Sequence, residues 1–197
     1  MNNQTVGKLE IICGPMFSGK SEELIRRLRR AKIAKKLVGV FKHALDQQRV
    51  EEVVRSHNGS SIPAYATDTP EAIITIAKRD NLTVVGIDEI QFFSTDIIPV
   101  ICQLIDTGIQ VIVAGLDTDH RGLPFGPVPT LLAIADNATK LQAICTLCGD
   151  EATRTQRLIN GKPGKFDDPI ILVGAQEAYQ ARCRNCHMVD KTPRATV

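Results

Sequence analysis

Along residues 1–140, short apolar runs alternate with stretches whose apolar residues recur at helical spacing. The continuous runs have the length of buried strands, and they cover residues 9–13, 38–41, 82–89 and 110–116. The amphipathic stretches predict helices over residues 21–36, 69–79, 95–106 and 130–136. Because strands alternate with helices, the pattern predicts an α/β fold with a mainly parallel sheet flanked by helices.

Turn and capping residues divide this pattern. Thr69-Pro70-Glu71 predicts a helix start, with Thr69 as the N-cap and Pro70 at the first helical position. Residues 42–62 are polar, and residues 117–128 are rich in Gly, Pro and Asp, so both segments are predicted to be loops. A connection as long as 42–62 is usually functional or disordered, but its composition favours an ordinary surface loop.

The composition is that of an ordinary globular protein, and it narrows the range of partners. Of the 197 residues, 43% are hydrophobic and 23% charged, and a net charge of +2 gives no argument for a nucleic-acid partner. The Arg and Lys residues of the helix at 21–36 lack aromatic companions, which favours a solvated helix face. No apolar run reaches the ~20 residues of a membrane span. The polar start lacks a signal-peptide core, so we expect a cytoplasmic protein with no membrane partner.

The segment Gly14–Ser21 matches G-x-x-x-x-G-K-[ST], the phosphate-binding loop, between the strand at 9–13 and the helix at 21–36. Glycines let backbone N–H groups face phosphate oxygens, at a helix N-terminus that favours negative charge. Lys20 can reach the β- and γ-phosphates, and the Ser21 hydroxyl can hold Mg²⁺. The residues expected to bind a nucleoside triphosphate are Gly14, Pro15, Met16, Phe17, Ser18, Gly19, Lys20 and Ser21.

Two acids end the apolar run at residues 82–89. In phosphate-loop enzymes a carboxylate at such a strand end anchors Mg²⁺, and Asp88 fits this role, acting through a water molecule. Glu89 faces another direction on an extended chain, so it is available for a different task. It can take the proton of an acceptor hydroxyl, position water in an ATPase, or pair with a cation. At this point the motifs fit a kinase and an ATPase equally well.

Two Cys-x-x-Cys pairs, separated by a few dozen residues, match the four-thiolate pattern of a structural zinc site. Disulfides at this spacing are disfavoured in a cytoplasmic chain. His187 could replace Cys186 as a ligand, but the symmetric spacing favours the cysteine. The expected zinc ligands are Cys145, Cys148, Cys183 and Cys186.

The cysteine pairs also define the predicted organisation of the chain. Residues 1–140 form the predicted phosphate-loop domain. Residues 141–192 form a small zinc-binding subdomain with a long internal loop, and 193–197 form a loose tail. Cys13 and Cys102 lie in apolar patterns and are predicted to be small core residues.

Taken together, these residues resemble the thymidine kinases of the cytosolic, zinc-containing type. The resemblance covers essentially the whole chain. It rests on the Pro-Met-Phe-Ser filling of the phosphate loop and on Asp88-Glu89-Ile90-Gln91-Phe92-Phe93. Gly115-Leu116-Asp117, Pro124-Phe125-Gly126 and the paired cysteines support it. The resemblance favours a kinase over an ATPase.

Several expectations follow from the resemblance alone. It implies transfer of the ATP γ-phosphate to the thymidine 5′-hydroxyl, with Glu89 as general base and Ser21 and Asp88 serving Mg²⁺. Arg49 and Gln91 join the expected ATP-binding residues. The loop between the cysteine pairs resembles the family's lid. The expected nucleoside-binding residues are Met16, Phe92, Leu116, Phe125, Thr155, Leu172, Val173, Gly174 and Tyr179. A homotetramer and feedback inhibition by thymidine triphosphate are also implied.

Three positions depart from the family pattern. His120 lies where the family usually carries Phe, Glu22 replaces the usual Thr after the loop serine, and Ile90 lies where a small residue is common. Two other functions compete with the kinase: a nucleic-acid-stimulated ATPase, and a zinc-ribbon binding module. Against the second, Tyr179 is the only aromatic residue near the second cysteine pair, which is little for a stacking platform.

Overall fold

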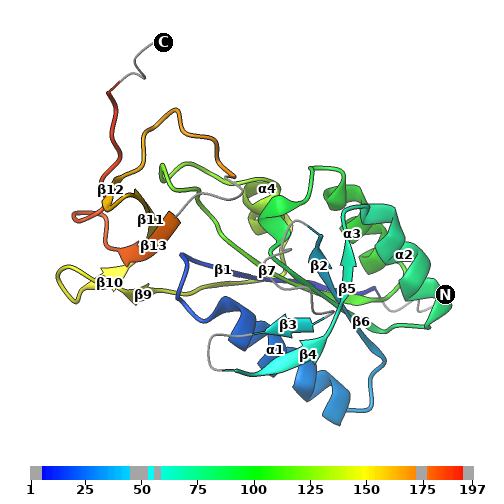
Figure 1. Ribbon diagram of the computed structural model, residues 1–197. Coiled ribbons are helices and arrows are strands. Elements are labelled where there is room, and N and C mark those ends of the chain that lie inside the picture. The colour runs from blue at the N-terminus through cyan, green and yellow to red at the C-terminus, as the bar shows by residue number, and fades with distance from the viewer. Residues whose placement is uncertain (1–5, 45–52, 56–58, 172–176, 193–197) are drawn as a thin grey trace.

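The computed structural model describes residues 6–44, 53–55, 59–171 and 177–192, and its centre is a six-stranded sheet (Figure 1). The strand order is β5-β2-β6-β7-β1-β8, and every neighbouring pair is parallel. The strands are β1 (Leu9–Cys13), β2 (Val38–His43), β5 (Tyr65–Thr67), β6 (Val84–Asp88), β7 (Gln110–Gly115) and β8 (Asn137–Lys140). The predicted parallel α/β fold is confirmed.

Helices cover both faces of this sheet, as Figure 1 shows. On one face lie α2 (Pro70–Arg79), α3 (Ile97–Asp106) and α4 (Val128–Ile134), and on the other lies α1 (Lys20–Ile33). The strands alternate between the two cores: in β1, Ile11 packs with α2, α3 and α4, while Ile12 packs with α1. Among the described helices, none is long and apolar enough to cross a membrane.

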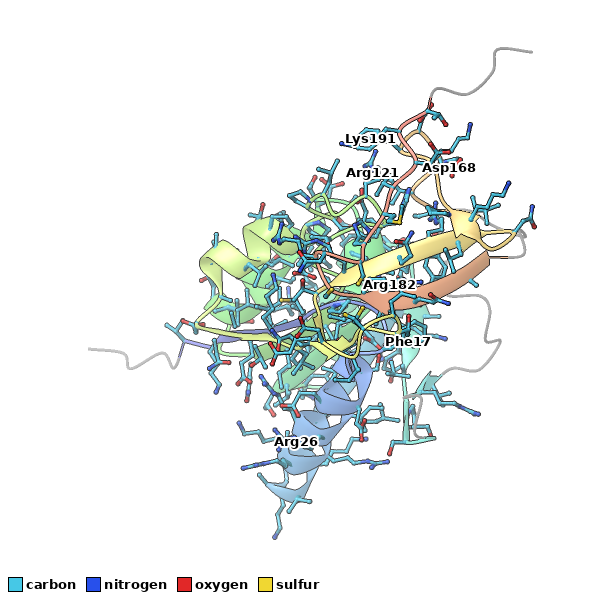
Figure 2. All side chains as sticks on the ribbon, turned by 90° about the vertical axis from the view of Figure 1, so that its left-hand side faces the viewer. Phe17, Arg26, Arg121, Asp168, Arg182 and Lys191 are labelled. Carbon is cyan, nitrogen blue, oxygen red and sulfur yellow. The ribbon has the colours of Figure 1, made fainter. Side chains whose placement is uncertain are left out.

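The helix α1 follows the phosphate loop and separates its apolar and charged faces. Leu24 and Leu28 are fully buried, and Leu28 packs so closely on β6 that a Cβ on Gly86 would lie 2.6 Å from its Cδ1 atom. On the outer side, the Arg26 and Arg27 guanidinium groups pair with Glu23 at 2.5 and 2.8 Å. Figure 2 shows Arg26 pointing away from the sheet. Apart from Arg27, which also pairs with Glu10 on β1 at 2.8 Å, the basic residues of the segment 21–36 form the solvated helix face that the composition favoured.

Two edge strands of the sheet were not predicted. The strand β8 is polar and mostly exposed, and β5 has only its last residue partly buried. An edge strand needs no continuous apolar run, because one side of it faces solvent. The segment predicted as a loop at 42–62 also contains β3 (Val53–Arg55) and β4 (Ser61–Pro63), an antiparallel pair that packs over α1. Their central residues, Val54 and Ile62, are buried.

Several element boundaries and one predicted helix cap differ from the prediction. The strand β6 ends at Asp88, one residue early, because Glu89 adopts a left-handed conformation and opens the 3₁₀ turn η1 (Ile90–Phe92). The helix α4 begins at Val128, two residues early. Pro70 starts α2 as predicted, but within the described contacts the Thr69 hydroxyl donates to Asp68 Oδ1 at 3.1 Å and does not cap the helix.

Residues after β8 form two small antiparallel sheets beside the phosphate-loop end of β1 (Figure 1). One joins β9 (Ala143–Ile144) to β10 (Glu151–Ala152). The other has β11 (Arg154–Ile159) at its centre, between β12 (Lys162–Pro163) and β13 (Glu177–Arg182). Residues 172–176, within the predicted lid, lie outside the described part of the chain.

We expect Leu28→Ala to lower the free energy of unfolding by about 2–5 kcal/mol, because it leaves a cavity between α1 and β6. The control Arg30→Ala lies on the same helix at an exposed position and should change stability by no more than about 0.5 kcal/mol. Urea unfolding followed by circular dichroism measures both values. Equal effects of the two substitutions would contradict the assigned packing of α1.

Candidate functional site

The phosphate loop joins β1 to α1 in the strand, loop and helix order that its motif requires. Gly19 adopts a left-handed conformation (φ 82°) and is the N-cap of α1. Gly14 has φ 146°, and a Cβ at this position would lie 2.3 Å from the carbonyl oxygen of Leu141. The loop backbone is therefore curled against the start of the C-terminal segment, and any residue larger than glycine at position 14 would displace it.

Lys20 is buried at the first turn of α1, and its ammonium group donates to the Pro15 carbonyl at 2.7 Å. The Ser18 hydroxyl donates to the same carbonyl at 2.8 Å. Burial lowers the pKa of Lys20, while the negative charges of Glu89 and Asp88 oppose that change. A cation held inside the loop and facing two carboxylates is suited to binding phosphate oxygens.

Asp88 ends β6 at the same edge of the sheet, and only 5% of its surface is exposed. The Glu89 backbone N–H donates to Asp88 Oδ1 at 3.1 Å, and the Ser21 hydroxyl lies close enough to interact with the Asp88 carboxyl group. Burial, followed by the charge of Glu89, raises the pKa of Asp88 to about 7. A carboxylate and a neighbouring hydroxyl are oxygen ligands of the kind Mg²⁺ prefers, so these two residues fit a magnesium site.

Glu89 leaves the strand with φ 52° and ψ 41°, which is uncommon for a residue with a side chain. The Gln91 side-chain amide donates to Glu89 Oε2 at 2.5 Å, and Gln91 Oε1 accepts from the Leu116 backbone N–H at 2.9 Å. Non-glycine residues in this conformation cluster at functional sites. The structure therefore brings together three residues that the sequence assigned to the site.

Aromatic side chains lie next to this group of residues. The rings of Phe92 and Phe125 meet edge-to-face, with centroids 6.0 Å apart and an interplanar angle of 87°. His43, at the end of β2, packs on Phe93 with a centroid distance of 4.7 Å. Phe92 and Phe125 remain partly exposed, whereas Phe93 is buried, so the first two can offer apolar surface to a ligand.

The phosphate loop is joined directly to the small C-terminal sheet. The Met16 backbone N–H donates to the Thr155 hydroxyl oxygen on β11 at 3.0 Å. Figure 2 shows Phe17, the next residue of the loop, beside β11 and β13. Thr155 and Met16 were both expected at the nucleoside site, and the structure places them in contact.

Tyr179 on β13 lies opposite Arg157 on β11. The buried Arg157 guanidinium donates to the Tyr179 hydroxyl at 3.2 Å and to the carbonyl oxygens of Pro169 and Ile170. Arg157 thus joins the central strand of the small sheet to the chain that leads towards residue 172. Arg157 was not predicted as a site residue, because the strand begins Arg-Thr-Gln-Arg and this polar sequence gives no signal that the arginine is buried.

Asp117 is a third carboxylate at this edge that the sequence analysis did not assign. It follows the end of β7, is buried, and lies 2.7 Å from the Lys140 ammonium group. Its charge also acts on Lys20. An acid immediately after a buried strand, as in the case of Asp88, was the signal that could have identified it.

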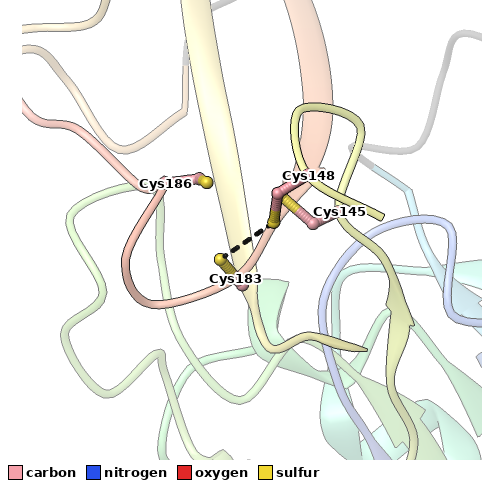
Figure 3. Close-up of side chains that lie close together, drawn as sticks. All are labelled: Cys145, Cys148, Cys183 and Cys186. Atoms are coloured by element: carbon pink, nitrogen blue, oxygen red, sulfur yellow. Dashed lines mark hydrogen bonds between the residues drawn. The ribbon is translucent and has the colours of Figure 1, made fainter. Parts of the chain in front are cut away.

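The four predicted metal-binding cysteines converge from two turns, one between β9 and β10 and one after β13 (Figure 3). Their sulfur atoms all lie within 4.8 Å of one another, and the Cys148 and Cys183 Sγ atoms are 3.7 Å apart. Tetrahedral Zn–S bonds of about 2.3 Å would set sulfur atoms about 3.8 Å apart, whereas a disulfide needs about 2.05 Å. The cluster therefore fits a zinc ion.

His187 does not belong to this cluster. Its Nε2 atom donates to the His120 carbonyl oxygen at 2.9 Å, which leaves Cys186 as the fourth sulfur ligand. His120 is itself buried, and its own Nε2 lies 3.3 Å from the Lys165 carbonyl oxygen. Cys13 is a buried core residue as predicted, and Cys102 is partly buried in α3.

Four of the expected binding residues fall in segments that the structure does not describe. Arg49, Leu172, Val173 and Gly174 lie outside the described residues. The other expected site residues gather at one end of the molecule, where the carboxyl ends of β1, β6 and β7 meet the small C-terminal sheet. That end contains a phosphate-binding loop, neighbouring carboxylates, aromatic surface and a four-cysteine cluster.

Comparison with known families gives a match that fits this arrangement. The family model described as thymidine kinase matches residues 7–187, which include the phosphate loop, the acidic strand end and all four clustered cysteines. Such an extent leaves out only short segments at the two ends of the sequence. This chain therefore belongs to the thymidine kinase family and is an ATP-dependent kinase.

Proposed function

We propose that the protein transfers the γ-phosphate of ATP to the 5′-hydroxyl of thymidine, giving thymidine monophosphate and ADP. The observation that carries this proposal is the meeting of Lys20, Asp88 and Glu89 at one sheet edge, in a chain of the thymidine kinase family. Phosphoryl transfer needs a cation that binds phosphate, a carboxylate that helps to hold Mg²⁺, and a carboxylate that accepts the proton of the hydroxyl. These three side chains can supply those roles.

On the nucleotide side, backbone N–H groups of residues 14–21 and the Lys20 ammonium group would bind the ATP phosphates. Ser21 and Asp88 would hold Mg²⁺, which neutralises charge on the phosphates when bound. Arg49 is proposed to contact the phosphates, as the resemblance implied. Lys20 would exchange the Pro15 carbonyl for phosphate oxygens, which are stronger acceptors because they are charged.

On the acceptor side, Glu89 is proposed as the general base. Its carboxylate takes the proton of the 5′-hydroxyl as that oxygen forms a bond to the γ-phosphorus. The bond between the γ-phosphorus and the β–γ bridging oxygen breaks, and ADP leaves. The turn at Glu89 follows directly on Asp88, and Gln91 holds the Glu89 carboxylate, so one carboxylate can serve the metal and the other the acceptor.

The nucleoside would be held mainly by apolar surface and main-chain groups. Phe92 and Phe125 already form an edge-to-face pair on which a thymine ring can pack. The remaining residues proposed around the nucleoside are Met16, Leu116, Thr155, Tyr179, Leu172, Val173 and Gly174. The last three belong to the proposed lid, whose described part is held by Arg157.

We also propose that the four-cysteine cluster holds structural zinc, and that residues 141–192 act as a zinc-binding subdomain beside a kinase domain at 1–140. Zinc would hold both ends of the lid, and so reduce the entropy lost when the lid closes. Assembly as a homotetramer and inhibition by thymidine triphosphate remain expectations that rest on the resemblance. A cytoplasmic location and the absence of nucleic-acid and membrane partners remain expectations that rest on the composition and pattern of the sequence.

The substrate is tested by offering ATP with thymidine, deoxyuridine, deoxycytidine or single-stranded DNA. We expect labelled γ-phosphate to appear on thymidine, with kcat/KM highest for this nucleoside among the three. DNA should not stimulate ATP consumption. ATP hydrolysis without labelled nucleoside, or hydrolysis that depends on DNA, would instead identify an ATPase.

The role of Glu89 is tested by Glu89→Gln, which keeps the size and shape of the side chain but removes the carboxylate that would accept the proton. We expect kcat to fall by about 10²–10⁴-fold, while the affinity for Mg²⁺ and a non-hydrolysable ATP analogue changes by less than about threefold. The control Glu71→Gln removes an exposed carboxylate on α2 and should leave kcat unchanged. Near-normal turnover of Glu89→Gln would remove this residue from the proposed role.

The metal is tested by comparing Cys145→Ser with Cys102→Ser, which alters a cysteine outside the cluster. Elemental analysis of the parent protein should find about one zinc per chain, and this zinc should be lost only in Cys145→Ser. The same variant should melt at a lower temperature, because metal binding supplies folding free energy. A zinc-free protein that keeps the parent melting temperature would contradict the proposed role of the cluster.

A further inference from the structure

The Gln91 side chain lies between the Glu89 carboxylate and the end of β7. One end of its amide donates to Glu89 Oε2 at 2.5 Å, and the other end accepts from the Leu116 backbone N–H at 2.9 Å. Only 2% of the Gln91 surface is exposed. The amide thus spans the space between the 3₁₀ turn η1 and the strand that lies between β6 and β1.

The orientation of this amide follows from its partners. A backbone N–H can only donate, so the atom of Gln91 that faces Leu116 must be the oxygen. The NH₂ group then points to Glu89, and an ionised carboxylate is an acceptor that forms strong hydrogen bonds. The Leu116 contact therefore determines which end of Gln91 faces the proposed base.

The surrounding backbone leaves the amide little room to move. A Cβ on Gly115 would lie 2.4 Å from Gln91 Oε1, and a Cβ on Gly126 would lie 2.4 Å from the Gln91 carbonyl oxygen. Both glycines allow the chain to approach Gln91 more closely than other residues would. Gln91 is therefore held from the β7 side and from the loop that precedes α4.

Glu89 needs such support because of its own conformation. Its left-handed backbone is unfavourable for a residue with a side chain, and such conformations persist when surrounding contacts hold them. The Gln91 hydrogen bond joins residues only two apart across this turn. It therefore stabilises the turn and restricts the carboxylate at the same time.

We propose that Gln91 is a positioning residue, which holds the Glu89 carboxylate in place for proton transfer and does not bind the nucleotide. This inference rests on the proposed function and changes one expectation of the resemblance, which assigned Gln91 to ATP. Positioning has a large effect on rate, since displacement of a catalytic group by about 1 Å can lower the rate about 10²-fold.

Two substitutions separate positioning of Glu89 from simple support of the fold. Gln91→Glu keeps an acceptor for Leu116 but sets a second carboxylate against Glu89. Gln91→Met has similar length and loses both hydrogen bonds. We expect Gln91→Glu to lower kcat by about 10- to 100-fold, and by more than Gln91→Met, because it displaces the Glu89 carboxylate by like-charge repulsion. The KM for ATP, and the affinity for Mg²⁺ with a non-hydrolysable ATP analogue, should stay within about threefold in both.

The exchanged pair, Glu89→Gln with Gln91→Glu, keeps the proposal testable if either single variant folds poorly. An amide at 89 can donate to a carboxylate at 91, so this double variant should recover the melting temperature lost in Gln91→Glu. Its kcat should equal that of Glu89→Gln alone, because residues that act as one unit have non-additive effects.

The outcomes distinguish failure of this inference from failure of the proposed function. The positioning role is overturned if Gln91→Glu is the milder variant in kcat, if both variants weaken ATP binding at unchanged kcat, or if the exchanged pair does not recover stability. If Glu89→Gln alone keeps normal turnover, the proposed base is wrong. The melting temperatures of Gln91→Glu and the exchanged pair then still decide whether the Glu89–Gln91 contact exists.

Discussion

The chemistry of this protein depends on the placement of one buried cation among carboxylates at the edge of a parallel sheet. Lys20 begins the helix that follows β1, Asp88 ends β6 and is followed by Glu89, and Asp117 lies after β7, the strand between β1 and β6. All neighbouring strands run parallel, so their carboxyl ends, and the acids that follow them, lie on one side. Burial of Lys20 lowers its pKa, and these acids oppose that change. The strand order therefore creates the electrostatic environment of the phosphate site.

The same edge places two adjacent acids in different surroundings. Asp88 is the last residue of a buried strand, where it accepts a hydrogen bond from the Glu89 backbone N–H and lies near Ser21. Glu89 begins a turn, and its described contact is with a side-chain amide that is anchored on the next strand. Asp88 thus lies beside Ser21 of the phosphate loop and Glu89 is held by Gln91, while the negative charges of both acids act on Lys20. The change from strand to turn between these two residues coincides with the positive φ of Glu89, and such conformations cluster at functional sites.

The sequence was sufficient to predict the parts of this site that depend on local pattern. Buried strands such as β6 need continuous apolar runs, and the phosphate loop and cysteine spacings have few alternative explanations. Edge strands such as β8 carry no such pattern. Contacts between distant segments were also beyond reach: no local signal joins Met16 to Thr155 or Gln91 to Leu116. Gln91 was assigned to the nucleotide through a motif, and only the distances to its two partners indicate a different role.

The C-terminal sheets show why a metal is expected where apolar packing is weakest. Their buried cluster consists of three alanines and two of the clustered cysteines, joined at its margin by Cys186. So few apolar atoms cannot offset the entropy of ordering these short strands. The side chains that would bind zinc therefore make up much of the local core, and metal binding would supply the missing free energy. Because β11 contacts the phosphate loop through Thr155, stability gained at the cysteines would also hold the loop in place. In this way a metal site that takes no part in the reaction would contribute to the geometry of phosphoryl transfer.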